Sequence, residues 1–422
     1  MSVSKIILNA TGEQDDSLFK NSEFTFFKNK SSRHTNFAKT LVEIDSNKIQ
    51  NNDTVINFGE TIDFTIDKTS DLLLNLTVKF ILQDNDKDIN NWNNFEKIVP
   101  ETLFALIDYI EIMSNDKVLQ KLSGIWMYTY FSLYKSNNKH LFDNASANIF
   151  TKTNLLGETN KEYTLHLPIP FWFSKSSELA FPLCSLEYEK ISVNIKINDF
   201  HKISKNALEK NYIIRGCKLL GEFIELTQTE KQTFLQQPLE YVIDQIEYNG
   251  PHNISVKNEK SLRQKIELEQ HYLVKELIWI CKEKNPNNLR NYFNFWHNNK
   301  NDYMRTDHFK NISILLNGRV LNPRFPASYY RLIQRNQHFK SDYHVDNDKK
   351  VKNNCIYSYS FNLNPEIIQS SGFLSFTKFN SIHLDLQMTS NSNTTKDREL
   401  FIFIKRFNII RVKNGRLNIL AN

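Results

Sequence analysis

Few residues in this sequence have the types and spacing that catalysis or cofactor binding requires. Gly216-Cys-Lys-Leu-Leu-Gly221 has the glycine spacing of a phosphate-binding loop. Such a loop continues with a lysine and a hydroxyl residue, which reach the phosphates and the magnesium ion. Here Glu222 and Phe223 stand at those two positions. We therefore interpret this segment as a strand that passes through two glycines, and we expect no cofactor.

The histidines and serines show no catalytic or metal-binding pattern. The 11 histidines include no His-x-His pair and no HExxH motif. A metal-dependent enzyme built on a β-sandwich would need such a pair on one strand, so that both imidazoles face the same side. His34, His166 and His383 each stand alone in or beside an expected strand, and we expect them to be structural. Since a GxSxG motif is also absent, the sequence predicts no catalytic residue, no metal site and no enzymatic activity.

Composition predicts a folded protein from a reducing compartment. Aromatic residues make up 13% of the 422 residues, which argues against disorder. The four cysteines follow no CxxC spacing, and we expect free, buried thiols at Cys184, Cys217, Cys281 and Cys355. The net charge of +6 comes from 53 basic and 47 acidic residues interspersed along the chain. No specific nucleic-acid-binding face is therefore indicated.

Targeting signals are not found in the sequence. The first residues lack the apolar region of a signal peptide. No apolar run approaches the ~20 residues that a membrane-spanning helix needs. We therefore expect a protein made in the cytosol.

One segment has the composition of an interaction site. Leu289-Arg-Asn-Tyr-Phe-Asn-Phe-Trp-His297 interrupts a connection rich in Asn and Lys. Clusters of Tyr, Phe, Trp and Arg are typical of interface hot spots. The same aromatic side chains could instead hold a long loop on its own domain, and both explanations stay open. The candidate subunit-contact residues are Arg290, Tyr292, Phe293, Phe295 and Trp296.

The sequence also contains a hairpin motif that occurs twice. Residues 110–120 (IEIMSNDKVLQ) and 312–322 (ISILLNGRVLN) align without a gap and share five identical positions. Each copy predicts a strand, a two-residue turn and a second strand, because Asn115-Asp116 and Asn317-Gly318 tolerate positive φ. The copies lie 202 residues apart, which suggests one domain built twice.

Alternating apolar residues predict many short strands. The clearest are Ile191–Ile197 and Ile382–Met388, which follow the two hairpins at similar distances. A capping pattern beginning at Thr227 predicts a short helix between the halves. We expect an all-β protein of tandem antiparallel sandwiches. Its predicted parts are an N-terminal arm (residues 1–20), a first domain (21–230) and a second domain (231–422).

A series of short motifs, in order over residues 20 to 420, resembles the major capsid proteins of nucleocytoplasmic large DNA viruses, the group that includes iridoviruses and chlorella viruses. In the first half these motifs are Arg33–Ala38, Ser123–Trp126, Leu167–Phe173, Leu179–Leu183 and Leu186–Ile191. In the second half they are Glu240–Gln245, Val274–Trp279, Leu316–Gly318, Tyr357–Phe361, Asn364–Pro365 and Ser370–Gly372.

The resemblance implies a double jelly roll, with two eight-stranded antiparallel β-sandwiches in tandem. It also implies a homotrimer that forms a pseudo-hexameric capsomer in the icosahedral shell of a large double-stranded DNA virus. Such a protein would be made in the host cytoplasm and would reside in the virion. Its partners would be neighbouring capsomers, minor capsid proteins and inner-membrane or penton contacts, with no small-molecule substrate.

Two alternatives remain at this point. The chain could be a minor capsid protein or an assembly scaffold of the same fold. A carbohydrate-binding β-sandwich would instead need a cleft with exposed aromatic side chains and paired carboxylates, and the duplication argues against it.

Overall fold

The computed structural model describes most of the chain in separate ranges. These are residues 21–23, 25, 27, 33–47, 55–84, 101–134, 161–204, 212–254, 263–269, 272–284, 292–298, 305–339, 355–389 and 397–420. Residues 1–36 and 37–422 form two separate units, and the strands and helices of the described ranges lie in the second. The predicted arm, residues 1–20, lies outside the described residues. No helix in the described ranges is long and apolar enough to span a membrane.

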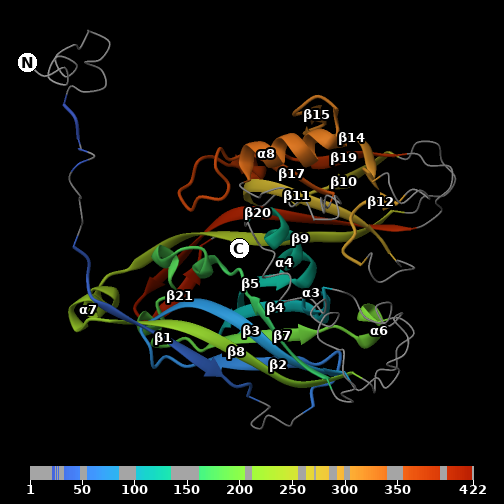
Figure 1. Cartoon of the computed structure of the whole chain (residues 1–422). Helices are drawn as coiled ribbons and strands as arrows, with labels where there is room; N and C mark the ends of the chain where they lie inside the picture. Colours follow the sequence, from blue (N-terminus) through green and yellow to red (C-terminus); the bar gives the residue numbers. More distant parts are fainter. Residues whose placement is uncertain are drawn as a thin grey trace, which may run out of the picture. The chain divides into compact units, whose positions relative to one another are not determined.

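The first half contains two four-stranded antiparallel sheets (Figure 1). Their strand orders are β1-β8-β3-β6 and β2-β7-β4-β5. In β7 every second side chain is buried, as the alternating sequence predicted. The strands are β1 (Phe37–Ile44), β2 (Thr61–Ile66), β3 (Leu72–Asp84), β4 (Ile107–Ser114), β5 (Lys117–Ser123), β6 (Lys161–Pro168), β7 (Ile191–Ile197) and β8 (Tyr212–Leu226).

The second half repeats this arrangement with additional short strands. Its main strands are β9 (Leu239–Ile254), β10 (Arg263–Glu267), β11 (Leu273–Glu283), β14 (Phe309–Leu316), β15 (Arg319–Val320), β17 (Ile356–Ser360), β19 (Ile382–Met388) and β20 (Arg398–Lys413). The short strands are β12 (His297–Asn298), β13 (Arg305–Thr306), β16 (Phe325–Pro326), β18 (Leu374–Ser375) and β21 (Arg416–Ile419). Of these, β21 forms a hairpin with β20 over the turn Asn414-Gly415.

The strand order is the same in both halves. When the main strands of each half are numbered from first to eighth, both halves have one sheet of order 1-8-3-6. The other sheet has order 2-7-4-5 in both halves. This pairing of first with last strand is the jelly-roll arrangement, so the predicted double jelly roll is confirmed.

Helices occupy the connections between strands. They are α3 (Thr102–Leu106), α4 (Gly124–Leu133), α6 (Phe200–Ile203), α7 (Gln228–Gln236) and α8 (Gln334–His338), with the π-helix η8 (Tyr329–Ile333). The 3-10 turns are η3 (Trp172–Ser174), η4 (Ser177–Leu179), η5 (Leu183–Ser185) and η9 (Phe376–Lys378). The helix predicted after Thr227 is confirmed as α7.

Two segments with the apolar sequence of a strand are partly helical. Residues 103–106, which lead into the first hairpin, belong to α3 and not to β4. In residues 373–379, only β18 is extended before the turn η9. All five residues of α3 are buried, so their sequence has no polar positions from which a helical period could be recognised.

The repeated hairpin takes the predicted form in both copies. Asn115 and Asn317 have positive φ values of 50° and 49°. Each asparagine side chain also accepts a hydrogen bond from the chain just before the neighbouring strand. Asn115 Oδ1 accepts from the backbone N of Lys190 at 2.9 Å, and Asn317 Oδ1 accepts from that of Asn380 at 2.7 Å. The hairpins are therefore equivalent in turn geometry and in the contact that fixes β7 and β19.

Candidate functional site at the contact between the halves

The predicted aromatic segment lies against helices of the first half. Phe293, Phe295 and Trp296 are buried, while Tyr292 is half-buried. The ring of Phe293 stacks on Tyr128 of α4 with centroids 4.2 Å apart. Arg290 lies outside the described residues. The described rings therefore attach their own loop to the same chain, and a contact of this segment with another subunit stays a prediction.

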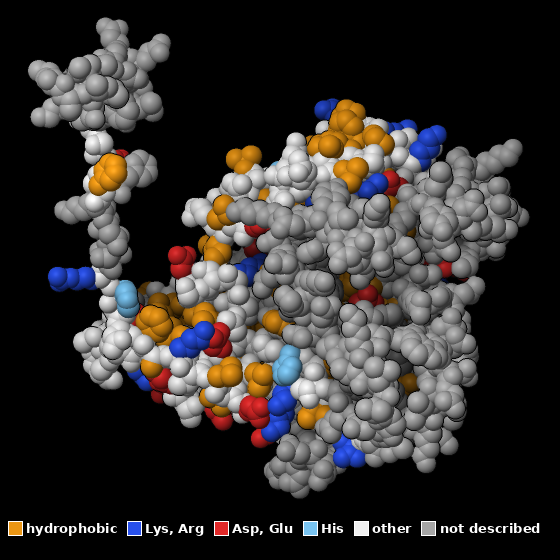
Figure 2. Space-filling model, in the orientation of Figure 1, with side chains coloured by type: hydrophobic (Ala, Val, Ile, Leu, Met, Phe, Trp, Pro, Cys, Tyr) orange, Lys and Arg blue, Asp and Glu red, His pale blue; other side chains and the backbone are white. Residues whose placement is uncertain are grey.

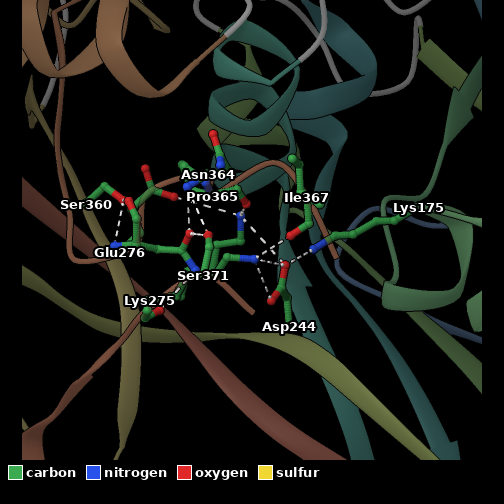
Figure 3. Close-up of polar contacts among 12 residues, drawn as sticks. Lys175, Asp244, Lys275, Glu276, Ser360, Asn364, Pro365, Ile367 and Ser371 are labelled. Atoms are coloured by element: carbon green, nitrogen blue, oxygen red, sulfur yellow. Dashed lines mark hydrogen bonds and ion pairs between the residues drawn. The ribbon is translucent and has the colours of Figure 1, made fainter. Parts of the chain in front are cut away.

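A second contact between the halves consists of buried charges. Asp244 on β9 accepts a hydrogen bond from Lys175, which follows η3 in the first half, at 2.9 Å. It also accepts from Lys275 on β11 at 3.3 Å. Figure 3 shows Lys175 and Lys275 directed at this one carboxylate from different elements. Lys405 on β20 lies 3.7 Å from the same group, so three lysines surround Asp244.

Glu276 is the second carboxylate of this buried charge cluster. The Tyr134 hydroxyl, at the C-terminal end of α4, donates to Glu276 Oε2 at 2.6 Å. Lys405 lies 3.8 Å from the same oxygen and donates to the backbone oxygen of Pro365 at 2.8 Å. The exposed fractions of Glu276 and Lys275 are both 0%. Buried ions at this depth are tolerated only when paired, so the cluster fixes how the halves meet.

The ionisation of the cluster follows from burial and from its excess of lysines. Burial acts to raise the pKa of Asp244, but the charges of Lys175, Lys405 and Lys275 outweigh it and lower this pKa. Burial lowers the pKa of Lys405 to about 8, against the opposing effect of Asp244. Burial raises the pKa of Glu276, although Lys405 and Tyr134 oppose it. Of the two carboxylates, Asp244 is therefore the one whose ionised form the cluster favours more strongly.

Sequence reasoning missed this cluster, although β11 carries a signal for it. Carboxylates that have no evident partner in a sequence are usually solvated surface groups, so Asp244 and Glu276 do not stand out. In β11, residues 277 to 281 are apolar without alternation, a pattern typical of a strand buried on both faces. Lys275 and Glu276 precede that run directly. Charged side chains in such a strand predict buried ion pairs with residues of other elements.

The glycines of the loop-like segment and the four cysteines lie in structural positions. Gly216 and Gly221 lie within β8, which confirms that the segment is a strand. Cys217, Cys281 and Cys355 are free and buried, and Cys184 is free and half-buried. Among the described residues, no group of three or more His, Cys, Asp or Glu side chains could hold a metal ion.

Two family models together match nearly the whole chain. Residues 25–218 match the model for the N-terminus of the major capsid protein. Residues 230–417 match the model for the large eukaryotic DNA virus major capsid protein. The chain belongs to this capsid protein family. Family membership assigns it a structural role in the capsid of a large DNA virus and confirms the predicted resemblance.

Curated relatives are similar in sequence to this chain over nearly their full length. The major capsid protein of Pyramimonas orientalis virus is 25% identical over 97% of this chain and 96% of its own. That of Paramecium bursaria Chlorella virus 1 is 23% identical over 97% of both chains. These relatives are capsid proteins of large DNA viruses.

Solved structures agree in fold. A chain of the PBCV-1 virus capsid superposes with a TM-score of 0.73 at 21% identity, covering 94% of this chain and 100% of that chain. The Faustovirus major capsid protein gives a TM-score of 0.70 at 9% identity, covering 96% and 94%. The double jelly roll is thus shared even where few residues are identical.

Proposed function

We propose that this chain is the major protein of an icosahedral capsid and that three copies form a pseudo-hexameric capsomer. The observation that carries the proposal is the tandem of two sandwiches with one strand order. Three copies of a chain with two similar parts present six similar parts around one axis. Assembly, rather than catalysis, is then the activity of the protein.

The expected trimer is a closed ring with head-to-tail contacts. Subunits related by threefold rotation bury different surfaces against each other, so one half of each chain meets the other half of the next. A permanent trimer of this kind buries on the order of 2,000 Å² or more per contact. Contacts between capsomers can be weaker, because a lattice repeats each of them many times.

The parts and partners follow from this assembly. We assign residues 21–230 and 231–422 to the two jelly rolls and residues 1–20 to an arm. The chain is made in the host cytoplasm and meets neighbouring capsomers, minor capsid proteins and penton or inner-membrane components. It takes no small-molecule substrate, cofactor or specific nucleic acid. In the aromatic segment, Tyr292 is the partly exposed ring among the described residues, so a subunit contact there would involve Tyr292 first.

Light scattering after size-exclusion chromatography tests the trimer. The purified chain should elute as one species with three times the mass of a single chain. A folded monomer across the micromolar range would contradict the proposal.

A minor capsid or scaffold role is the second candidate. One virus, Acanthamoeba polyphaga mimivirus, has relatives named capsid protein 1 and probable capsid proteins 3 and 4. The last is 22% identical over 96% of this chain, so similarity over the whole length does not distinguish the roles. Quantitative mass spectrometry of purified virions does, because a major protein must dominate the particle.

A further inference from the structure

Two corresponding sheets carry polar side chains at matching positions. In the first half, Glu222 of β8 pairs with Asn75 of β3 directly after a bulge in β3. In the second half, Lys405 of β20 pairs with Glu276 of β11 directly after a bulge in β11. These pairs therefore occupy the same place in the two jelly rolls.

The first strand of each half extends the match. Leu41 of β1 pairs with Glu222, and Ile246 of β9 pairs with Lys405. Two residues earlier stand Lys39 and Asp244, on the same side of their strands. We name these sets the first-half face (Lys39, Leu41, Asn75, Glu222) and the second-half face (Asp244, Ile246, Glu276, Lys405).

The two faces differ in burial. Asp244, Glu276 and Lys405 are 8%, 0% and 2% exposed, because Tyr134 and Lys175 of the first half cover them. On the first-half face, the side chain of Lys39 is 55% exposed and Leu41 is 71% exposed. Asn75 and Glu222 are half-buried, so the first-half face is open at Lys39 and Leu41, whereas the charged residues of the second-half face are covered.

The elements that cover the second-half face are the first hairpin and α4, which are buried by it. The matching elements of the second half are more exposed. Leu119 in the first copy of the hairpin is 2% exposed, and its backbone oxygen accepts from Gln245 of β9 at 2.7 Å. Leu321, at the matching position of the second copy, is 40% exposed. Similarly Trp126 of α4 packs on Phe403 of β20 with ring centroids 5.0 Å apart.

The helical part of the second half instead exposes apolar side chains. Ile333, where η8 meets α8, is 46% exposed, and Ile367, in the loop after β17, is 49% exposed. This loop corresponds to the loop after β6 that holds Lys175. Figure 2 shows hydrophobic side chains gathered over β15 and α8. The covering surface of the second half comprises Leu321, Ile333 and Ile367, and it stays exposed among the described residues.

We propose that the covering surface of one copy binds the first-half face of a second copy. This repeats between subunits the contact that each chain makes between its own halves. The inference rests on the proposed trimer and names the surfaces that close its ring. A head-to-tail ring requires two different, complementary surfaces on each subunit, and these two are the open counterparts of a contact already formed inside the chain.

The chemistry of the repeated contact differs from that of the internal one. Lys175 forms an ion pair with Asp244 inside the chain. At the corresponding places of the repeated contact, Lys39 stands for Asp244 and the loop of Lys175 carries the apolar Ile367, so no equivalent ion pair forms. Beside Leu41 lies a pocket of about 360 Å³ that Ser174 also lines. The Ser174 hydroxyl is buried and has no hydrogen-bond partner among the described residues. An incoming side chain that fills this pocket would bury Leu41.

Crosslinking between copies tests the contact directly. In a Cys184→Ser background, one chain carries Leu41→Cys and another carries Leu321→Cys. When the two chains are co-assembled and treated with a short bismaleimide, they should form covalent dimers on a denaturing gel. Each chain alone should give none, because the two sides of the contact are different. Leu420→Cys, an exposed leucine outside both surfaces, replaces Leu321→Cys as the matched control.

Loss of one apolar contact gives an independent measurement. Leu41→Asp should raise the concentration at which half of the chains are trimeric by about tenfold or more, with an unchanged circular dichroism spectrum. Leu420→Asp should leave that concentration unchanged. A normal Leu41→Asp trimer without crosslinks overturns this contact and leaves the trimer proposal standing. A wild-type chain that stays monomeric overturns both.

Discussion

Asp244 and Lys39 occupy matching positions in the first strands of the two jelly rolls, yet they have opposite charge and opposite exposure. Lys405 and Glu222 also occupy matching positions with opposite charge, and Lys405 is buried whereas Glu222 is half-buried. What differs is the cover: the second-half face lies under Tyr134 and Lys175, and the first-half face is open within the chain. A duplicated backbone thus keeps its strand pairing, while the side chains on each copy suit what covers that copy.

The largest expected effect tests whether the hairpins are equivalent. Ile112 and Ile314 are both 0% exposed on strands that pair with β7 and β19. Ile112→Asp and Ile314→Asp should each abolish soluble, folded protein, because an unpaired carboxylate would be buried in a core. Yield of soluble protein and circular dichroism measure this. Lys117→Ala, on the exposed turn, is the control and should fold normally.

One folded Asp variant would break the equivalence of the two copies. If Ile314→Asp folded and Ile112→Asp did not, the second hairpin would be dispensable for its jelly roll.

The next effect compares the two faces. Asp244→Asn removes the carboxylate that pairs with the buried Lys275 and Lys405 and the half-buried Lys175, and should lower the free energy of unfolding by about 3–5 kcal/mol. Lys39→Met, at the matching open position, should change it by about 0–1 kcal/mol. Denaturant unfolding at one fixed protein concentration measures both, since assembly adds to apparent stability. Equal effects would contradict the difference in cover.

A smaller effect concerns the hydrogen bond that α4 contributes to the buried cluster. Tyr134→Phe removes the donor to Glu276 and should cost about 1–3 kcal/mol of unfolding free energy. Tyr130→Phe is a control one turn earlier in the same helix and should cost much less. The same unfolding experiment distinguishes them, and a Tyr134→Phe variant as stable as wild type would show that the cluster does not depend on this bond.

Much of the fold could be predicted from the sequence because its signals are local. Residues 191–197 alternate strictly, and Asn317-Gly318 specifies a tight turn, so strand and hairpin follow from short-range sterics. The repeat then gave two similar domains. The α3 segment could not be predicted in the same way, because its burial on every side erases the period that distinguishes helix from strand.

The contact between the halves was less accessible for a different physical reason. A charged residue is expected at the surface unless its partner is known. The partner of Asp244, Lys175, lies 69 residues away in the sequence, so the pair is not evident from local patterns. Phe293 and Tyr128 have the composition of a subunit interface, but inside one chain of two domains an internal contact uses the same residue types. Composition identifies a segment that is suited to an interface, and only the fold shows which surface it contacts.

In the proposed capsomer, three chains with two equivalent jelly rolls each form a closed ring of six jelly rolls. Negative-stain electron microscopy of the purified, wild-type chain tests it most directly. The account predicts particles with a hexagonal outline and threefold symmetry, each made of three chains. Monomers, or rings with another number of chains, would contradict it.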